Sequence, residues 1–82
     1  MKDELLKIAD MLGRVIQKNN KDVISSYKKN VASNNINTAR IISDELVDYL
    51  AEINDGSSKA QKRIQLATDL YDKTMEYYEE HC

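Results

Sequence analysis

The chain has 82 residues and a formal net charge of −2, with 12 Lys and Arg against 14 Asp and Glu. Leu, Ile and Val together supply 19 residues, whereas Phe, Trp and Pro are absent. A domain this small is marginally stable alone, and a chain with so few large apolar side chains often gains stability by oligomerising. We therefore expect one domain over residues 1–82, with an aliphatic core, tyrosines at its margin and a homo-oligomeric state.

The charge is distributed unevenly along the chain. Residues 1–31 carry seven Lys and Arg and four Asp and Glu, whereas residues 40–82 carry five and ten. Because these two segments have opposite net charge, they favour contact with each other within one chain, or head-to-tail contact between subunits. The overall balance argues against duplex DNA as a partner, because neutralising its phosphates takes a strong excess of basic residues.

The chain lacks the usual signs of membrane insertion or export. No apolar run approaches the roughly 18 residues of a transmembrane helix, and no apolar region of a signal peptide follows the N-terminal segment MKDELLK. The lone cysteine, Cys82, has no partner for a disulfide, which indicates a reducing compartment. We expect no membrane association and a cytoplasmic location, which is the host cytoplasm if the gene belongs to a phage.

Helical spacing of apolar residues begins close to the N-terminus. It predicts a first helix over residues 3–18, whose apolar stripe contains Leu5, Ile8, Leu12 and Val15. A shorter pattern predicts a second helix over residues 21–32. This second helix is either separate from the first or continuous with it through residues 19 and 20.

Two longer patterns follow and predict an antiparallel helical hairpin over residues 35–54 and 58–79. Asn-Asp-Gly separates them, and we expect Gly56 to be the left-handed cap of the first of these helices. Ser57 or Ser58 is expected to be the N-cap of the second. The predicted fold class is therefore all-α, a small bundle in which this hairpin packs against one or two N-terminal helices.

The last predicted helix carries two apolar stripes. One contains Ala60, Ile64, Ala67, Tyr71 and Met75, and the other contains Leu66, Leu70 and Tyr77. Two stripes exceed what one partner helix covers. Either this helix occupies a central place in the bundle, or the second stripe forms a subunit interface.

No pattern of catalytic, metal-binding or cofactor-binding residues is present. The only histidine, His81, lies beside Cys82 at the end of the chain, and a metal site between helices would take Glu-x-x-His pairs on facing helices. A glycine-rich phosphate loop is also absent. We therefore predict a protein that is not an enzyme, with no catalytic residue, metal or cofactor.

The start of the last helix, SSKAQKR, combines features of an anion site. Helix N-termini present N–H groups without intrahelical partners, here those of Ser58, Lys59 and Ala60. Lys59, Lys62 and Arg63 add positive charge where the helix dipole disfavours it. Either this is an ordinary capped turn with solubilising lysines, or Ser57, Ser58, Lys59 and Arg63 bind an anion.

A second candidate patch is SYKK in the second predicted helix. Tyr27 is placed to stack on a base while Lys28 and Lys29 contact phosphates, as aromatic and basic groups do together in nucleotide sites. The alternative is a half-buried tyrosine beside solvated lysines.

The segment ARIISDELVDYLAEINDGSSK and the helix after it resemble the helical hairpin domain of phage anti-CBASS cyclic-oligonucleotide sponges. In that family a helix with the pattern Arg-x4-Glu-Leu ends in an acidic turn, and a helix that begins with Ser and a basic residue follows. The matching positions are Arg40, Glu45, Leu46, Asp55, Ser58, Lys59, Thr68, Leu70 and Met75.

This resemblance covers residues 40–79, and the chain departs from the family at several points. The N-terminal segment with aromatic residues and proline is absent, Asp44 stands where the family has lysine, and no Trp follows Met75. The resemblance implies a compact homo-oligomer that sequesters signalling cyclic nucleotides without hydrolysing them. It also implies ligand contacts from Tyr27, Arg40, Ser58 and Lys59.

Two functions are consistent with these features. The first is a non-enzymatic sponge for cyclic oligonucleotides, with candidate ligand-binding residues Tyr27, Lys28, Arg40, Ser57, Ser58, Lys59 and Arg63. The alternative is a small helical immunity or regulatory protein that binds and inhibits a protein partner. A basic partner would suit the acidic residues Asp69, Asp72, Glu76, Glu79 and Glu80, which otherwise form the solvated side of the last helix.

Overall fold

The structure of the protein is a computed structural model, which describes residues 2–16 and 20–81. Four helices follow one another in these described ranges: α1 (Lys2–Val15), α2 (Lys21–Ala32), α3 (Ile36–Glu52) and α4 (Ser58–His81). Within the described ranges there is no strand. The predicted all-α class is therefore confirmed.

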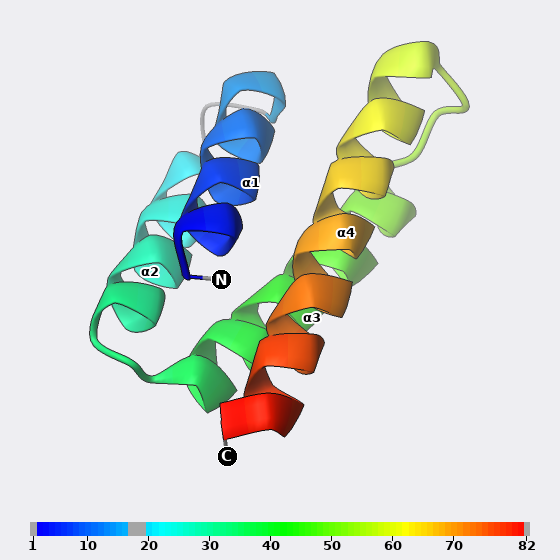
Figure 1. Ribbon diagram of the computed structural model, residues 1–82. Coiled ribbons are helices and arrows are strands. Elements are labelled where there is room, and N and C mark those ends of the chain that lie inside the picture. The colour runs from blue at the N-terminus through cyan, green and yellow to red at the C-terminus, as the bar shows by residue number, and fades with distance from the viewer. Residues whose placement is uncertain (1, 17–19, 82) are drawn as a thin grey trace.

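The four helices alternate in direction and form an up-and-down bundle (Figure 1). Each helix packs against two others, so that the order around the bundle is α1, α2, α3, α4 and back to α1. The most extensive contact joins α3 to α4, which is the predicted antiparallel hairpin. The contact between α1 and α4 joins segments that are far apart in the sequence.

The bounds of α1, α3 and α4 differ from the predicted ones by one to three residues. Helix α1 begins one residue early and ends at Val15, and predicted helical positions 17 and 18 lie outside the described residues. Helix α2 has the predicted bounds and is separate from α1, because Ile16 lies in a bend. Helix α3 is shorter than predicted at both ends, whereas α4 extends two residues further. The Tyr77 and His81 rings, 4.2 Å apart, provide a contact one turn apart in this extension.

Asn34 and Gly56 have positive φ, and each lies in a connection between two helices. Asn34, at φ 63°, follows the last turn of α2, and the N–H of Asn35 donates to the carbonyl of Asn30 while that of Asn34 donates to the carbonyl of Val31. These two bonds form a Schellman motif, in which asparagine replaces the usual glycine.

Gly56 is left-handed as predicted, at φ 81°, but it does not cap α3. The helix ends at Glu52 and its C-cap is Ile53, so Gly56 lies in the second half of the connecting loop. The prediction was wrong about the cap because Asn54 and Asp55 have already left the helix and make local turns of their own.

The core contains residues from all four helices and is largely aliphatic. Its members are Leu5, Ala9, Leu12, Ile16, Ile24, Tyr27, Val31, Ala39, Leu46, Leu50, Ala67 and Leu70. Burying a leucine side chain fully contributes roughly 1.5–3 kcal/mol, so this cluster supplies the main stabilisation. Tyr27 is fully buried at its centre, whereas the sequence predicted tyrosines only at the margin.

The two apolar stripes of α4 are explained within one chain. Because α4 packs against both α3 and α1, two helices of the same chain cover its apolar stripes. Leu70 has 0% exposure and belongs to the core, together with Ala67. The second stripe is therefore not a subunit interface formed through Leu70.

Among the described helices, none combines the length and the apolar character needed to span a membrane.

Candidate anion-binding groove

The loop before α4 uses several of its own N–H groups. The Ser57 hydroxyl accepts a hydrogen bond from the N–H of Ala60 at 3.1 Å, which makes Ser57 the N-cap of α4. The side chains of Asn54 and Asp55 accept bonds from the N–H groups of Gly56 and Ser57, both at 2.9 Å. Of the three N–H groups expected to be free, that of Ala60 is therefore already bonded.

Asp55 places a carboxylate at the same turn. Hydrogen bonds from Ser57, first from its hydroxyl and then from its N–H, hold the pKa of the Asp55 carboxyl below its usual value. The helix start thus has a negative group of its own. The Asp55 carboxylate would repel an external anion that approached from the loop side. Ser57 is therefore an ordinary helix cap.

The other candidate residues at the start of α4 are Ser58, Lys59 and Arg63, and their side chains have different environments. The Arg63 guanidinium donates from Nε to the carbonyl of Lys59 at 3.3 Å and lies along its own helix, and its charge also acts on Asp55. Ser58 and Lys59 are exposed. Of this group, Lys59 lines a cavity.

That cavity lies between the end of α1 and the start of α4. It has a volume of about 400 Å³ and is lined by Arg14, Val15, Ile16, Lys59 and Lys62. A second cavity of about 180 Å³ is lined by Met11, Arg14, Val15, Lys62 and Leu66. The two share three residues and form one surface, which we call the basic groove: Met11, Arg14, Val15, Ile16, Lys59, Lys62 and Leu66.

The basic groove has three cations without a counterion. In residues 2–16 and 20–81, none of Arg14, Lys59 and Lys62 forms an ion pair; the three pairs present are Lys28–Asp10, Lys73–Glu4 and His81–Glu80. Like charges that line one cavity repel each other, and Lys59 also opposes the dipole of α4. A bound anion would reverse the sign of both effects.

Tyr27 does not belong to this surface. Its side chain has 0% exposure, and its hydroxyl is 2.7 Å from Thr74 Oγ1. Because the Thr74 hydroxyl donates to the carbonyl of Leu70, the Tyr27 hydroxyl is the donor to Thr74. Burial raises the pKa of Tyr27 to about 12. No face of the ring is open to a base, so we withdraw Tyr27 from the candidate site.

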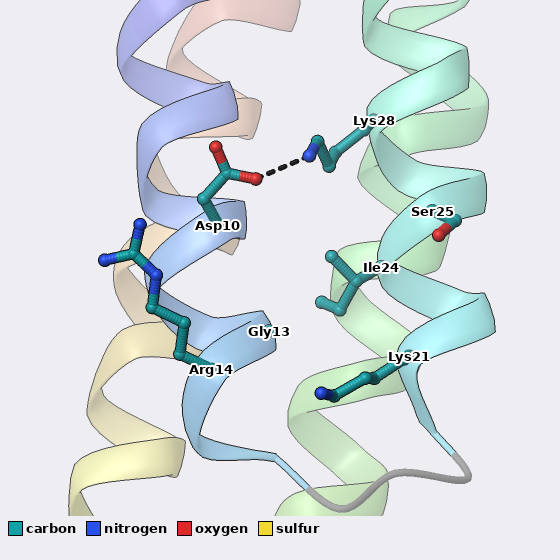
Figure 2. Close-up of a pocket in the computed structure, with 7 residues that line it drawn as sticks. All are labelled: Asp10, Gly13, Arg14, Lys21, Ile24, Ser25 and Lys28. Atoms are coloured by element: carbon teal, nitrogen blue, oxygen red, sulfur yellow. Dashed lines mark hydrogen bonds and ion pairs between the residues drawn. The ribbon is translucent and has the colours of Figure 1, made fainter.

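Lys28 lies between α1 and α2 and has a partner there. Its ammonium forms an ion pair with Asp10, and Figure 2 shows these two side chains pointing toward each other. They line a cavity of about 440 Å³, whose other residues are Gly13, Arg14, Lys21, Ile24 and Ser25. The guanidinium of Arg14 lies away from Lys28 (Figure 2). Lys28 is thus adjacent to the basic groove through Arg14 but is not part of it.

Arg40 lies at the opposite end of the hairpin. Its Nη2 donates to Asn37 Oδ1 at 2.7 Å, and its guanidinium carbon is 5.1 Å from the ring centroid of Tyr78. Tyr78 and Ser58 are separated by 20 helical residues, or about 30 Å. The structure therefore does not bring Arg40 together with Ser57, Ser58 and Lys59.

Arg14 and Lys62 were not among the candidate site residues predicted from the sequence. Arg14 is a basic residue in the last turn of α1, which on its own indicates only a favourable interaction with the helix dipole. Its role becomes visible when α1 and α4 are known to be antiparallel neighbours. No group of three or more potential metal-binding side chains occurs in the part of the chain that the structure describes.

The fold and the groove define a small up-and-down four-helix bundle with a cation-lined surface at one end. Protein-family models, curated proteins and solved structures were compared with the chain, and none of them matches it.

Proposed function

We propose that this protein is a non-enzymatic binding protein that takes a phosphate-bearing anion in the basic groove. The observation that carries the proposal is the set of Arg14, Lys59 and Lys62, which line one cavity without an ion pair in the described ranges. Three unpaired cations on two helices destabilise the empty bundle. They become favourable contacts when an anion is bound.

The chemistry of the groove favours phosphate among anions. Arginine binds phosphate oxygens in a bidentate manner, and lysines add point charges. Lys59 is in the first turn of α4, so the helix dipole adds to the attraction. Met11, Val15 and Leu66 add an apolar floor next to the cations, which suits a ligand with a non-ionic part.

Cyclic oligonucleotides are the first ligands to test, because the hairpin resembles that of the cyclic-oligonucleotide sponges. In this proposal the protein sequesters such a signal in the cytoplasm without hydrolysing it. Lys59 contacts the ligand, as the resemblance implies. Arg14 and Lys62 are the further ligand contacts in this proposal, and they replace the predicted contacts from Tyr27 and Arg40. Ser57 and Ser58 line neither cavity of the groove, and Ser57 keeps its role as the N-cap of α4.

The proposal includes self-association of the chain. Met11 and Ile41 are 41% and 43% exposed although both are large apolar residues on regular helices. A chain of this size gains stability when such residues are covered by another copy.

Thermal unfolding with a panel of cyclic di- and trinucleotides, with inorganic phosphate for comparison, tests the binding. At a ligand concentration of one hundred times Kd, the free energy of unfolding rises by about 2.7 kcal/mol. For a domain this small, that corresponds to a rise in Tm of roughly 10 °C or more. Lys62→Glu should remove the shift.

Lys29→Glu is the matched control, since Lys29 is exposed on α2 and the change in charge is the same. It should leave the ligand-induced shift unchanged. If neither cyclic nucleotides nor phosphate raises Tm, the anion-binding function is wrong, and an inhibitory protein that binds a partner becomes the function to test.

A further inference from the structure

Helix α3 carries an exposed face that is acidic and has one large apolar residue. Ile41, Glu45, Asp48 and Glu52 follow one another at spacings of four, three and four residues, which places them on one side of the helix. All four are exposed, and none of the three carboxylates forms an ion pair in the described part of the chain. We call this surface the acidic stripe.

The acidic stripe and the basic groove lie on opposite sides of the bundle. The groove follows the contact between α1 and α4, whereas Glu45 lines a cavity between α2 and α3 together with Val23, Leu46 and Tyr49. Since the helices are ordered α1, α2, α3, α4 around the bundle, these two contacts face away from each other. One copy therefore cannot bring its own stripe to its own groove.

We propose that the acidic stripe of one copy docks into the basic groove of a second copy, an inference that rests on the proposed self-association. The two surfaces have opposite charge, and each has an exposed apolar residue, Ile41 in the stripe and Met11 in the groove. Helices that bind in grooves use anchors at such three- and four-residue spacings. Neither surface has another partner in the described chain.

The spacing of the residues supports one register. Ile41 and Glu45 are about 6 Å apart along α3, and Met11 and Arg14 are about 4.5 Å apart along α1. With Ile41 against Met11 and Leu66, Glu45 lies beside Arg14 and Lys62. Asp48, a further turn along α3, then lies on the side of Lys59.

Contact between two different surfaces has a consequence for assembly. Each bound copy still presents one free stripe and one free groove, so association continues into a ring or an open chain. Because the contact is between exposed charges, salt should weaken it. Phosphate-bearing ligands should also oppose it, since they occupy the same cations.

Two double variants test the contact. Glu45→Lys with Asp48→Lys removes the stripe, and Arg14→Glu with Lys62→Glu removes the groove. Sedimentation velocity from 10 µM to 1 mM should show each variant alone as a monomer with at least tenfold weaker association than wild type. An equimolar mixture should associate again, because the intact groove of the stripe variant fits the intact stripe of the groove variant, and the two reversed surfaces also carry opposite charges.

Asp72→Lys with Glu79→Lys is the control for net charge, since it alters two exposed carboxylates on α4 and should associate as wild type does. A monomeric wild type at 1 mM would contradict self-association itself. An associating wild type with unaffected variants, or a mixture that stays monomeric, would contradict only this interface. Phosphate and nucleotide binding by the stripe variant, whose groove is intact, is measured separately and reports on the proposed function alone.

Discussion

Two polar clusters connect α4 with the N-terminal helices, and they differ in how their groups are paired. Near the middle of the bundle, Tyr27 donates to Thr74 and Thr74 donates to Leu70, so the buried hydroxyls are bonded. At one end, Arg14, Lys59 and Lys62 line a cavity and have no counterion in the described ranges. The first arrangement is complete within one chain, whereas the second lacks a counterion in the described ranges and is completed by a bound anion in the proposed function. This difference separates residues that stabilise the fold from residues that are available for binding.

The largest effect is expected at the paired cluster. Tyr27→Ala removes a fully buried ring and leaves a cavity between α2 and α4, so the free energy of unfolding should fall by roughly 3–5 kcal/mol. Chemical denaturation followed by circular dichroism measures the loss. A loss below about 1 kcal/mol would show that the bundle closes around the gap and that the contact is not central.

The next effect depends on pH. Burial raises the pKa of Tyr27 to about 12 in the folded protein, whereas the tyrosine of the unfolded chain has the ordinary pKa of 10.0. Below pH 10 both states hold the proton, but between pH 10 and 12 only the unfolded state loses it. Stability is therefore full below pH 10 and falls by roughly 3 kcal/mol as pH rises through this window.

Tyr27→Phe provides the control for this pH dependence. Lysine titration affects both proteins, including that of Lys73, whose pKa is raised by its hydrogen bond to Glu4. The difference between wild type and Tyr27→Phe therefore isolates the phenol. If the two proteins lose stability equally between pH 10 and 12, the phenol is not held neutral by the fold.

The smallest effect is expected at the unpaired cluster, and its sign is opposite. Lys59→Glu places a negative charge in the first turn of α4, so the ligand-free protein should gain about 0.3–1 kcal/mol. The same variant should lose binding of phosphate-bearing ligands at least tenfold. Isothermal titration and thermal unfolding measure the two effects independently, and a loss of stability without ligand would contradict the proposed electrostatics.

The helices could be predicted from the sequence because each signal is local. Apolar spacing and the absence of proline identified all four helices, and Ser57 was one of two candidates for the cap of α4. The burial of Tyr27 could not be predicted in the same way, since it depends on Thr74, which is 47 residues away. Arg14 was missed for the same reason, because its neighbours Lys59 and Lys62 belong to the last helix.

The position of Arg40 could not be predicted from the short sequence pattern of the hairpin. It lies four residues into α3, and the antiparallel arrangement places it beside Tyr78 rather than beside the loop that carries Ser57. A pattern in linear sequence gives the order of these residues. Which end of the bundle each one occupies depends on helix direction and length.

The contact between α1 and α4 also bears on how the chain folds. The other three contacts join helices that are consecutive in the chain, so each can form with short loop closure, whereas the α1–α4 contact closes almost the whole chain. The basic groove exists only once that contact is made. A ligand held there binds the complete bundle and not its separate hairpins, so binding would also make unfolding more cooperative, by suppressing states in which α1 has detached.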